Sequence, residues 1–163
     1  MENSMAVETI ITISGLTKKF KDVTAVNDIS LTVRKGTIFA FLGTNGAGKS
    51  TTINMLTTVL QPSAGTARVA GYELGKDDAN IRQTIGVVFQ QSLLDPLLTV
   101  RENLRLRAAF YELKDTDKRI ADLAKLIGLT DFLDRRYGKL SGGQRRRVDI
   151  ARALVHKPEL LFL

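Results

Sequence analysis

The N-terminal part of the chain alternates apolar and polar residues, the period of two that β-strands show when one face is buried. Residues 10–13 follow this period, and residues 29–33 repeat it with Ser30 and Thr32 on the polar face. Residues 38–42 are instead apolar without interruption. This run predicts a central parallel strand that is covered on both faces.

The following segments predict two helices and two short strands. Residues 49–60 predict a helix that ends at the turn of residues 61–65, which contains a proline and a glycine. Short strands are predicted at residues 66–70 and 85–89, with a small helix at residues 78–83 between them.

From Thr99 onward the apolar residues recur at helical spacing, which predicts three amphipathic helices. Their apolar stripes are Leu104, Ala108 and Tyr111 in the first helix; Ile120, Leu123, Leu126 and Ile127 in the second, which stops at Gly128; and Val148, Ala151 and Val155 in the third, which begins near the N-cap Ser141 and ends at Pro158. Residues 160–163 predict a further buried strand.

Length and composition narrow the class of protein. A chain of 163 residues with 44% hydrophobic residues predicts one globular domain with a core. No apolar run approaches the roughly 18–20 residues that span a bilayer. Residues 1–13 carry Glu2 and Glu8, so they do not resemble a secretion signal. The chain has no cysteine, which excludes disulfides and cysteine-ligated metals and favours the cytoplasm.

The net charge of +7 is concentrated in the second half of the chain. Residues 1–100 contain 9 Lys/Arg against 8 Asp/Glu, whereas residues 101–157 contain 15 against 8. Such an excess is compatible with nucleic acid or anionic headgroups as partners. The simpler interpretation, which we favour, is a set of solvated helix faces.

Residues 43–50 match the phosphate-binding pattern G-x-x-x-x-G-K-[ST] in full, between a predicted strand and a predicted helix. Glycines allow successive backbone N–H groups to surround phosphate oxygens, and the helix adds its positive dipole end. Lys49 would contact the β- and γ-phosphates, and the Ser50 hydroxyl would bind Mg²⁺. The alternative is a plain glycine turn with a surface lysine. The pattern predicts ATP and Mg²⁺ as cofactors, bound by Gly43, Thr44, Asn45, Gly46, Ala47, Gly48, Lys49, Ser50 and Thr51.

The phosphate-loop pattern alone does not identify the reaction, because kinases, GTPases and motor ATPases all contain it. A second glycine-containing helix start narrows the choice among these classes of protein. Residues 140–144 read Leu-Ser-Gly-Gly-Gln and precede the helix that starts near Ser141. Together with the phosphate loop about ninety residues earlier, this pentapeptide resembles the signature motif of ATP-binding cassette (ABC) ATPases. The resemblance extends over residues 10–163. It implies that Ser141, Gly142, Gly143 and Gln144 bind the ATP of a second subunit in trans.

The resemblance also implies roles for two single residues. Phe20 lies where the family has an aromatic residue stacked on adenine, although it could be an ordinary core residue. Gln90 resembles the family's glutamine that contacts Mg²⁺ and the attacking water, and the adjacent Gln91 is the less favoured ligand. Lys49 and Gln90 are therefore the candidate catalytic residues of the chain, and Ser50 and Gln90 its candidate metal ligands.

The family resemblance predicts the fold class and the partners. It implies an α/β fold, with a P-loop core that has a mixed sheet and antiparallel N-terminal strands, plus a helical subdomain. The predicted divisions are residues 1–98, 99–157 and 158–163, the last being the start of a catalytic strand. The sequences of residues 98–104 and 149–163 most resemble those of daunorubicin-resistance-type exporters. This implies a cytoplasmic ATPase on the inner face of the membrane, a homodimer or paired ATPase subunit, and a separate permease.

Two other functions stay open. The chain could be a soluble ABC ATPase that acts on ribosomes or nucleic acid, although no direct nucleic-acid contact is expected, or a nucleotide-binding module without catalysis. The family's aspartate and general-base glutamate follow the strand at residues 160–163, so the 163 residues are expected to lack both carboxylates. On their own they are expected to bind nucleotide weakly, to hydrolyse essentially none, and to expose apolar faces.

Overall fold

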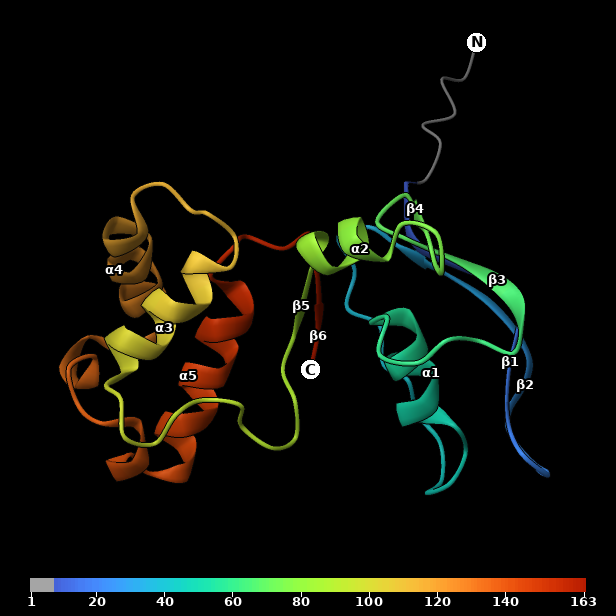
Figure 1. Cartoon of the computed structure of the whole chain (residues 1–163), viewed down its shortest axis with the longest axis horizontal. Helices are drawn as coiled ribbons and strands as arrows, with labels where there is room; N and C mark the ends of the chain where they lie inside the picture. The colour runs from blue at the N-terminus through green and yellow to red at the C-terminus, as the bar shows by residue number, and fades with distance from the viewer. Residues whose placement is uncertain (1–7) are drawn as a thin grey trace, which may run out of the picture. The chain divides into compact units, whose positions relative to one another are not determined.

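The computed structural model describes residues 8–163, in two compact units that divide after Ile85 (Figure 1). Each unit is described by itself. Of the segment predicted not to be a secretion signal, residues 1–7 lie outside the described residues. None of the helices in residues 8–163 has the length and apolar composition that a membrane crossing requires.

The first unit contains an antiparallel sheet with the strand order β2-β1-β3-β4. Strands β1 (Thr9–Phe20) and β2 (Val23–Arg34) form a long hairpin, and β1 also pairs with β3 (Ala64–Val69), which pairs with β4 (Tyr72–Glu73). The apolar residues of β1 and β3 form much of the buried core of this unit. The antiparallel strands predicted at the N-terminus and at residues 66–70 are therefore confirmed, whereas β4 has no signal in the sequence pattern.

Two helices complete the first unit. Helix α2 (Asp78–Thr84) confirms the small predicted helix. Helix α1 (Lys49–Leu56) begins where predicted but ends four residues before Leu60. Thr58 has a φ of 64°, a left-handed conformation that stops the helix, and the N–H groups of Val59 and Leu60 both donate to the carbonyl of Asn54.

The prediction of a central strand at residues 38–42 is wrong in this structure. The segment is a connection without regular secondary structure, and Ile38 and Leu42 are 103% and 88% exposed. A strand forms only when a neighbour accepts and donates its backbone hydrogen bonds. Within residues 8–163, no strand pairs with this segment. Phe39 and Phe41 contact each other, with ring centroids 6.3 Å apart.

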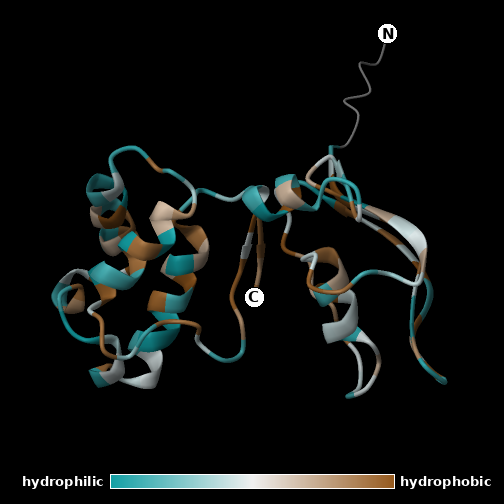
Figure 2. Ribbon diagram, viewed as in Figure 1, coloured by the Kyte–Doolittle hydropathy of each residue, from teal (hydrophilic) through white to brown (hydrophobic). Residues whose placement is uncertain are grey.

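The second unit is mainly helical. Helices α3 (Val100–Ala109), α4 (Thr116–Ile127) and α5 (Gly142–Leu154) share one core, and each carries both hydrophobic and hydrophilic residues (Figure 2). The short 3₁₀ turns Thr130–Phe132 and Tyr137–Lys139 connect α4 to α5. Strands β5 (Ile85–Val87) and β6 (Leu160–Phe162) pair with each other.

Most of the predicted helical stripes are confirmed, with exceptions at the helix ends and at Leu126. Helix α3 ends before Tyr111, and α5 ends at Leu154, four residues before the predicted stop at Pro158. Leu104, Ile120 and Val148 are fully buried, but Leu126 is 75% exposed. Ala124 occupies the buried face of α4 instead, because residues at positions i and i+4 lie on one face and Ala124 is four residues after Ile120. The predicted stop at Gly128 is confirmed, with a φ of 69° that favours glycine.

Gly86→Ala should destabilise the second unit. A Cβ at this position would lie 2.4 Å from the carbonyl oxygen of Ala153 and 2.9 Å from a methyl group of Leu161. Overpacking of this kind costs about 1–3 kcal/mol of unfolding free energy. Urea unfolding measures the change. Gly143→Ala is the matched control, since a Cβ there meets nothing within 4 Å, and equal stability of the two variants would contradict the packing argument.

Candidate nucleotide-binding site

The phosphate loop of residues 43–50 surrounds the end of one lysine side chain. Lys49 Nζ donates to the carbonyl oxygens of Gly43 at 2.7 Å and Thr44 at 2.6 Å. The N–H of Ala47 donates to the carbonyl of Thr44 at 3.2 Å and closes a turn. The ammonium group is therefore held within the loop and takes no part in the core.

Two glycines give the loop its shape. Gly46 and Gly48 have φ angles of 85° and 80°, which residues with a side chain rarely adopt. At Gly48 the reason is also steric, since a Cβ would lie 2.4 Å from the carbonyl oxygen of Ala25 on β2. The loop therefore packs against the hairpin at a place where only glycine fits.

The start of α1 is open to an anion. The first-turn N–H groups of Lys49, Ser50 and Thr51 have no acceptor within the helix, and the first turn contains no acidic residue. Gly48 has no side chain that could cap them. Unpaired N–H groups, the helix dipole and the Lys49 ammonium together suit phosphate oxygens. The residues present therefore fit a nucleoside triphosphate.

The same loop fits a magnesium ion that is shared with a phosphate ligand. Ser50 is exposed and presents a hydroxyl oxygen, the kind of ligand that Mg²⁺ prefers. Within the described residues, no group of three or more His, Cys, Asp or Glu could hold a metal by itself. Mg²⁺ usually binds through few protein ligands plus substrate phosphates, which agrees with this arrangement.

Phe20, the predicted adenine-stacking residue, lies at the end of β1 in the same unit as the phosphate loop. Its side chain is 44% exposed, and Lys18 Nζ lies 5.1 Å from the ring centroid. Phe20 is therefore not an ordinary buried core residue. An exposed ring beside a cation could stack on a base, so this role stays a prediction.

Gln90 lies in the second unit, in the loop that follows β5. The residue is exposed, and the carbonyl of its neighbour Phe89 accepts a hydrogen bond from Arg146 of α5 at 3.2 Å. The structure therefore places Gln90 on a loop that is attached to α5, whereas Lys49 and Ser50 belong to the first unit.

The predicted signature residues form the N-terminus of α5. Ser141 is the N-cap and forms a capping box with Gln144: the Gln144 N–H donates to Ser141 Oγ at 3.4 Å, and the Ser141 N–H donates to Gln144 Oε1 at 3.0 Å. Gly142 and Gly143 are exposed, with nothing near their missing side chains. The first turn contains no acidic residue, so this helix start is also open to an anion.

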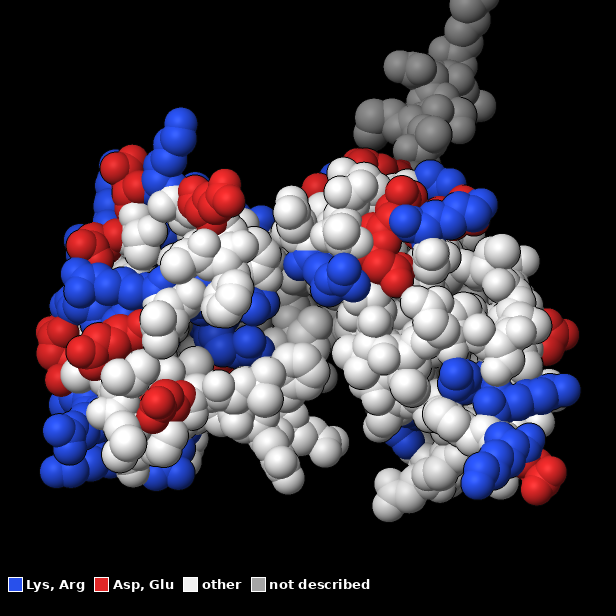
Figure 3. All heavy atoms as spheres, viewed as in Figure 1, with Lys and Arg blue, Asp and Glu red and all other residues white. Residues whose placement is uncertain are grey.

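Three consecutive arginines, Arg145–Arg147, follow the capping box, and each donates to a backbone carbonyl of another segment. The acceptors are Gly138 for Arg145 at 2.7 Å, Phe89 for Arg146 at 3.2 Å and Gly128 for Arg147 at 3.0 Å. Part of the basic excess of the second half therefore stabilises the fold. Other Lys and Arg side chains of this unit lie on its surface among acidic ones (Figure 3).

Sequence reasoning missed a cluster of buried polar side chains on α5 and their hydrogen-bond partners. Asp149 of α5 is buried and accepts hydrogen bonds from Ser92 and Tyr137, and Arg152 donates to the carbonyl of Val87 at 2.7 Å. Burial raises the pKa of Tyr137, and burial lowers the pKa of Arg152, an effect that nearby Arg107 increases and Asp149 opposes. The only signal in the sequence was a charged residue directly beside the apolar stripe of a helix.

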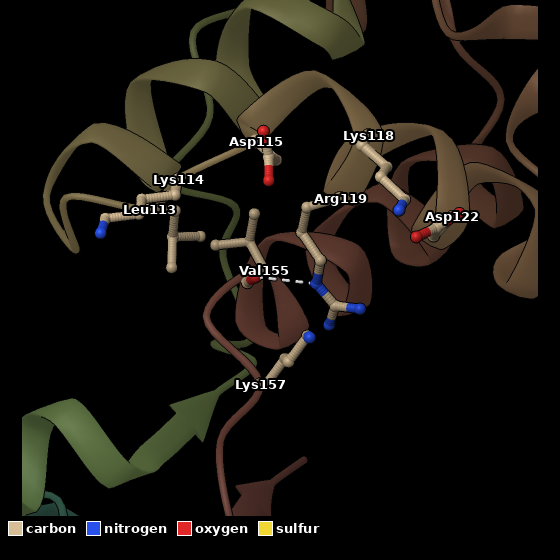
Figure 4. A pocket seen from close by; sticks show the side chains of 8 residues that line it. All are labelled: Leu113, Lys114, Asp115, Lys118, Arg119, Asp122, Val155 and Lys157. Atoms are coloured by element: carbon tan, nitrogen blue, oxygen red, sulfur yellow. Dashed lines mark hydrogen bonds between the residues drawn. The ribbon is translucent and has the colours of Figure 1, made fainter.

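A pocket of about 350 Å³ lies in the second unit away from the signature residues (Figure 4). Arg119 of α4 crosses it and donates to the carbonyls of Leu154 and Val155 at the end of α5. Burial lowers the pKa of this guanidinium. The pocket contains none of the predicted site residues. Its lining residues are Leu113, Lys114, Asp115, Lys118, Arg119, Asp122, Val155 and Lys157.

A phosphate loop on an antiparallel hairpin unit, with a Ser-Gly-Gly-Gln helix start on a helical unit, defines one class of ATP-binding protein. The chain belongs to the ABC transporter family, whose sequence profile matches residues 26–163. The predicted fold class is confirmed by solved ATP-binding cassettes. One of them is cbiO1 of Clostridium perfringens, part of the ABC transporter complex cbiONQ, with a TM-score of 0.84 and 29% identity over 94% of this chain and 64% of cbiO1.

Two relatives of known name are ATP-binding proteins. The ABC transporter ATP-binding protein NatA of Bacillus subtilis is 40% identical over 161 residues, covering 94% of this chain and 65% of NatA. The daunorubicin/doxorubicin resistance ATP-binding protein DrrA of Streptomyces peucetius is 43% identical over 160 residues, covering 97% of this chain and 47% of DrrA. The chain thus spans between about half and two thirds of the length of these relatives.

Proposed function

We propose that this chain is the ATP-binding part of an ABC ATPase that powers export through a separate permease. The observation that carries the proposal is the phosphate loop, in which the Lys49 ammonium and the open N-terminus of α1 converge. Family membership supports ATP as the nucleotide. The drug-resistance name of a relative with 43% identity supports the direction of transport.

The predicted nucleotide-binding residues have distinct parts in this proposal. The N–H groups of Gly46 and of residues 48–51, together with the Lys49 ammonium, hold the β- and γ-phosphates. The exposed ring of Phe20 stacks on adenine. Ser50 and Gln90 would hold Mg²⁺. When bound, Mg²⁺ supplies positive charge that neutralises the oxygens of the β- and γ-phosphates.

The signature residues serve a second subunit in this proposal. The unpaired N–H groups of Gly142 and Gly143 and the hydroxyl of Ser141 are offered to the γ-phosphate that the partner subunit holds. ATP then favours the closed pair over the open one because both subunits contact it only in the closed state. The pair acts on the inner face of the cell membrane, where the loop after Gln90 and the basic helices after Arg101 contact the permease.

Gln90→Ala should lower the rate of ATP hydrolysis with little change in ATP affinity. Gln90 is exposed on a loop and contributes nothing to the core, so the substitution should not affect folding. Its proposed role is to position the attacking water and Mg²⁺. Loss of such positioning reduces turnover about 10²-fold. Steady-state phosphate release by the full-length protein measures the effect. Gln91→Ala is the matched control. A larger loss of turnover in that variant would show that Gln91, and not Gln90, has the proposed role.

Coupling to a permease is tested separately. Hydrolysis is measured with membrane vesicles that contain a candidate polytopic permease, and with vesicles that lack it. Faster turnover only with the permease, together with ATP-dependent efflux, supports the proposal. Stimulation by ribosomes or nucleic acid without the permease would contradict it.

A further inference from the structure

A buried carboxylate in the second unit joins two segments that are far apart in the sequence. Asp149 lies on α5 with 8% of its surface exposed. Ser92 Oγ donates to Asp149 Oδ1 at 2.7 Å, and the Tyr137 hydroxyl lies 3.3 Å from Oδ2 and 3.5 Å from Oδ1. Ser92 follows Gln90 by two residues, and Tyr137 precedes Ser141 by four.

Further hydrogen bonds fasten the same two segments to each other. The Gly138 N–H donates to the carbonyl of Pro96 at 2.9 Å, and the Tyr137 N–H donates to the carbonyl of Leu98 at 2.9 Å. Ser92 also accepts a hydrogen bond from the N–H of Leu94 at 3.2 Å, which orders the loop locally. The loop that carries Gln90 and the turn before the signature motif therefore form one connected structure, with Asp149 at its buried side.

Packing alone gives no reason for an aspartate at this position. A buried carboxylate pays a desolvation cost, and apolar residues of similar size often replace buried charges without loss of stability. Here two hydroxyl groups donate to the carboxylate, and the charge of Arg152 one helical turn away favours it. What the carboxylate adds over an apolar side chain is direction, because hydrogen bonds fix both hydroxyl partners in place.

We propose that Asp149 is a positioning residue, which holds the Gln90 loop in a fixed place relative to the signature motif. The inference rests on the proposed function. Capture of ATP by the phosphate loop of one subunit does not involve Asp149. Hydrolysis by the closed pair does, because it requires Gln90 and Ser141 at the same time.

The test compares kcat, KM and ATP affinity of the full-length protein for Asp149→Ala, Asp149→Asn and Ser92→Ala. We expect Asp149→Ala to bind ATP as the parent does and to lose about tenfold to a hundredfold in kcat, the size of a typical coupling between sites. Asp149→Asn should recover most of this loss, because its amide oxygen still accepts the hydrogen bond from Ser92. Ser92→Ala should lower kcat in the same direction, and the double variant should be no worse than Asp149→Ala alone.

Three further measurements make the result decisive. Asp131→Ala removes an exposed carboxylate of the same unit and should leave kcat unchanged. Thermal unfolding shows which variants are folded, and Ser92→Ala, a change in a loop, provides the test if Asp149→Ala fails to fold. A parent-like kcat in folded Asp149→Ala and Ser92→Ala, or an equal loss of ATP affinity, would overturn the inference. Lys49→Ala is measured in parallel, and hydrolysis that survives this change would overturn the proposed function itself.

Discussion

Lys49→Ala is expected to weaken ATP binding by about a hundredfold and to leave the fold intact. The Lys49 ammonium contacts only the carbonyls of Gly43 and Thr44, so its removal creates no cavity in the core. Each charge-assisted hydrogen bond to phosphate is worth about 1.5–3 kcal/mol, and tenfold in affinity corresponds to about 1.4 kcal/mol. Titration calorimetry with a non-hydrolysable ATP analogue measures the loss.

The matched control for this experiment is Lys76→Ala. Lys76 is an exposed lysine of the same unit, and its ammonium pairs with Glu73 at 2.7 Å. This variant should bind the analogue as the parent does. Unchanged affinity in Lys49→Ala, with the circular dichroism spectrum of a folded protein, would refute the assignment of residues 43–50 as the phosphate site.

The second large effect is expected from Ser141→Arg in the full-length protein, which should block ATP hydrolysis and ATP-dependent pairing of subunits. Ser141 is exposed at the start of α5, so the arginine would extend into the space proposed for the partner's triphosphate. Loss of the serine cap costs only about 1 kcal/mol, so the helix should persist. Phosphate release and analytical ultracentrifugation with ATP measure turnover and pairing.

Binding of ATP by a single subunit should survive this change, because Ser141 belongs to the second unit and the phosphate loop to the first. Ser141→Thr is the control, since threonine keeps a hydroxyl and is also a good N-cap. Normal turnover in Ser141→Arg would show that the signature residues do not complete the site of another subunit.

The helical unit was the part of the fold that the sequence predicted best, because local signals determine its elements. Thr99 and Ser141 both form capping boxes with the residue three positions later, and Gly128 ends α4 in the left-handed conformation. The phosphate loop was equally predictable, because its spacing of glycines and lysine is a pattern within eight consecutive residues, although the contact of Gly48 with Ala25 on β2 is not local. Local chemistry and local structure agree at these positions.

Features that depend on distant residues could not be predicted. The apolar run at residues 38–42 indicates a preference for burial but not whether another strand is present to pair with it, and in this structure none of the described strands does. The partners of Asp149 lie 57 and 12 residues away, at distances for which a single sequence contains no signal. A charge beside an apolar stripe shows that a partner is needed, but not which one.

The three arginines after the capping box add to the packing of Val148 and Ala151 in holding the orientation of α5 about its own axis. Successive helical residues point about 100° apart, so Arg145, Arg146 and Arg147 leave the helix in three directions. Each ends at a carbonyl of a different segment, at Gly138, Phe89 and Gly128. A roll of the helix in either direction would lengthen at least one of these hydrogen bonds. The start of α5 is thus attached to three different segments, and a rotation of its N–H groups within the unit would have to break at least one of these attachments.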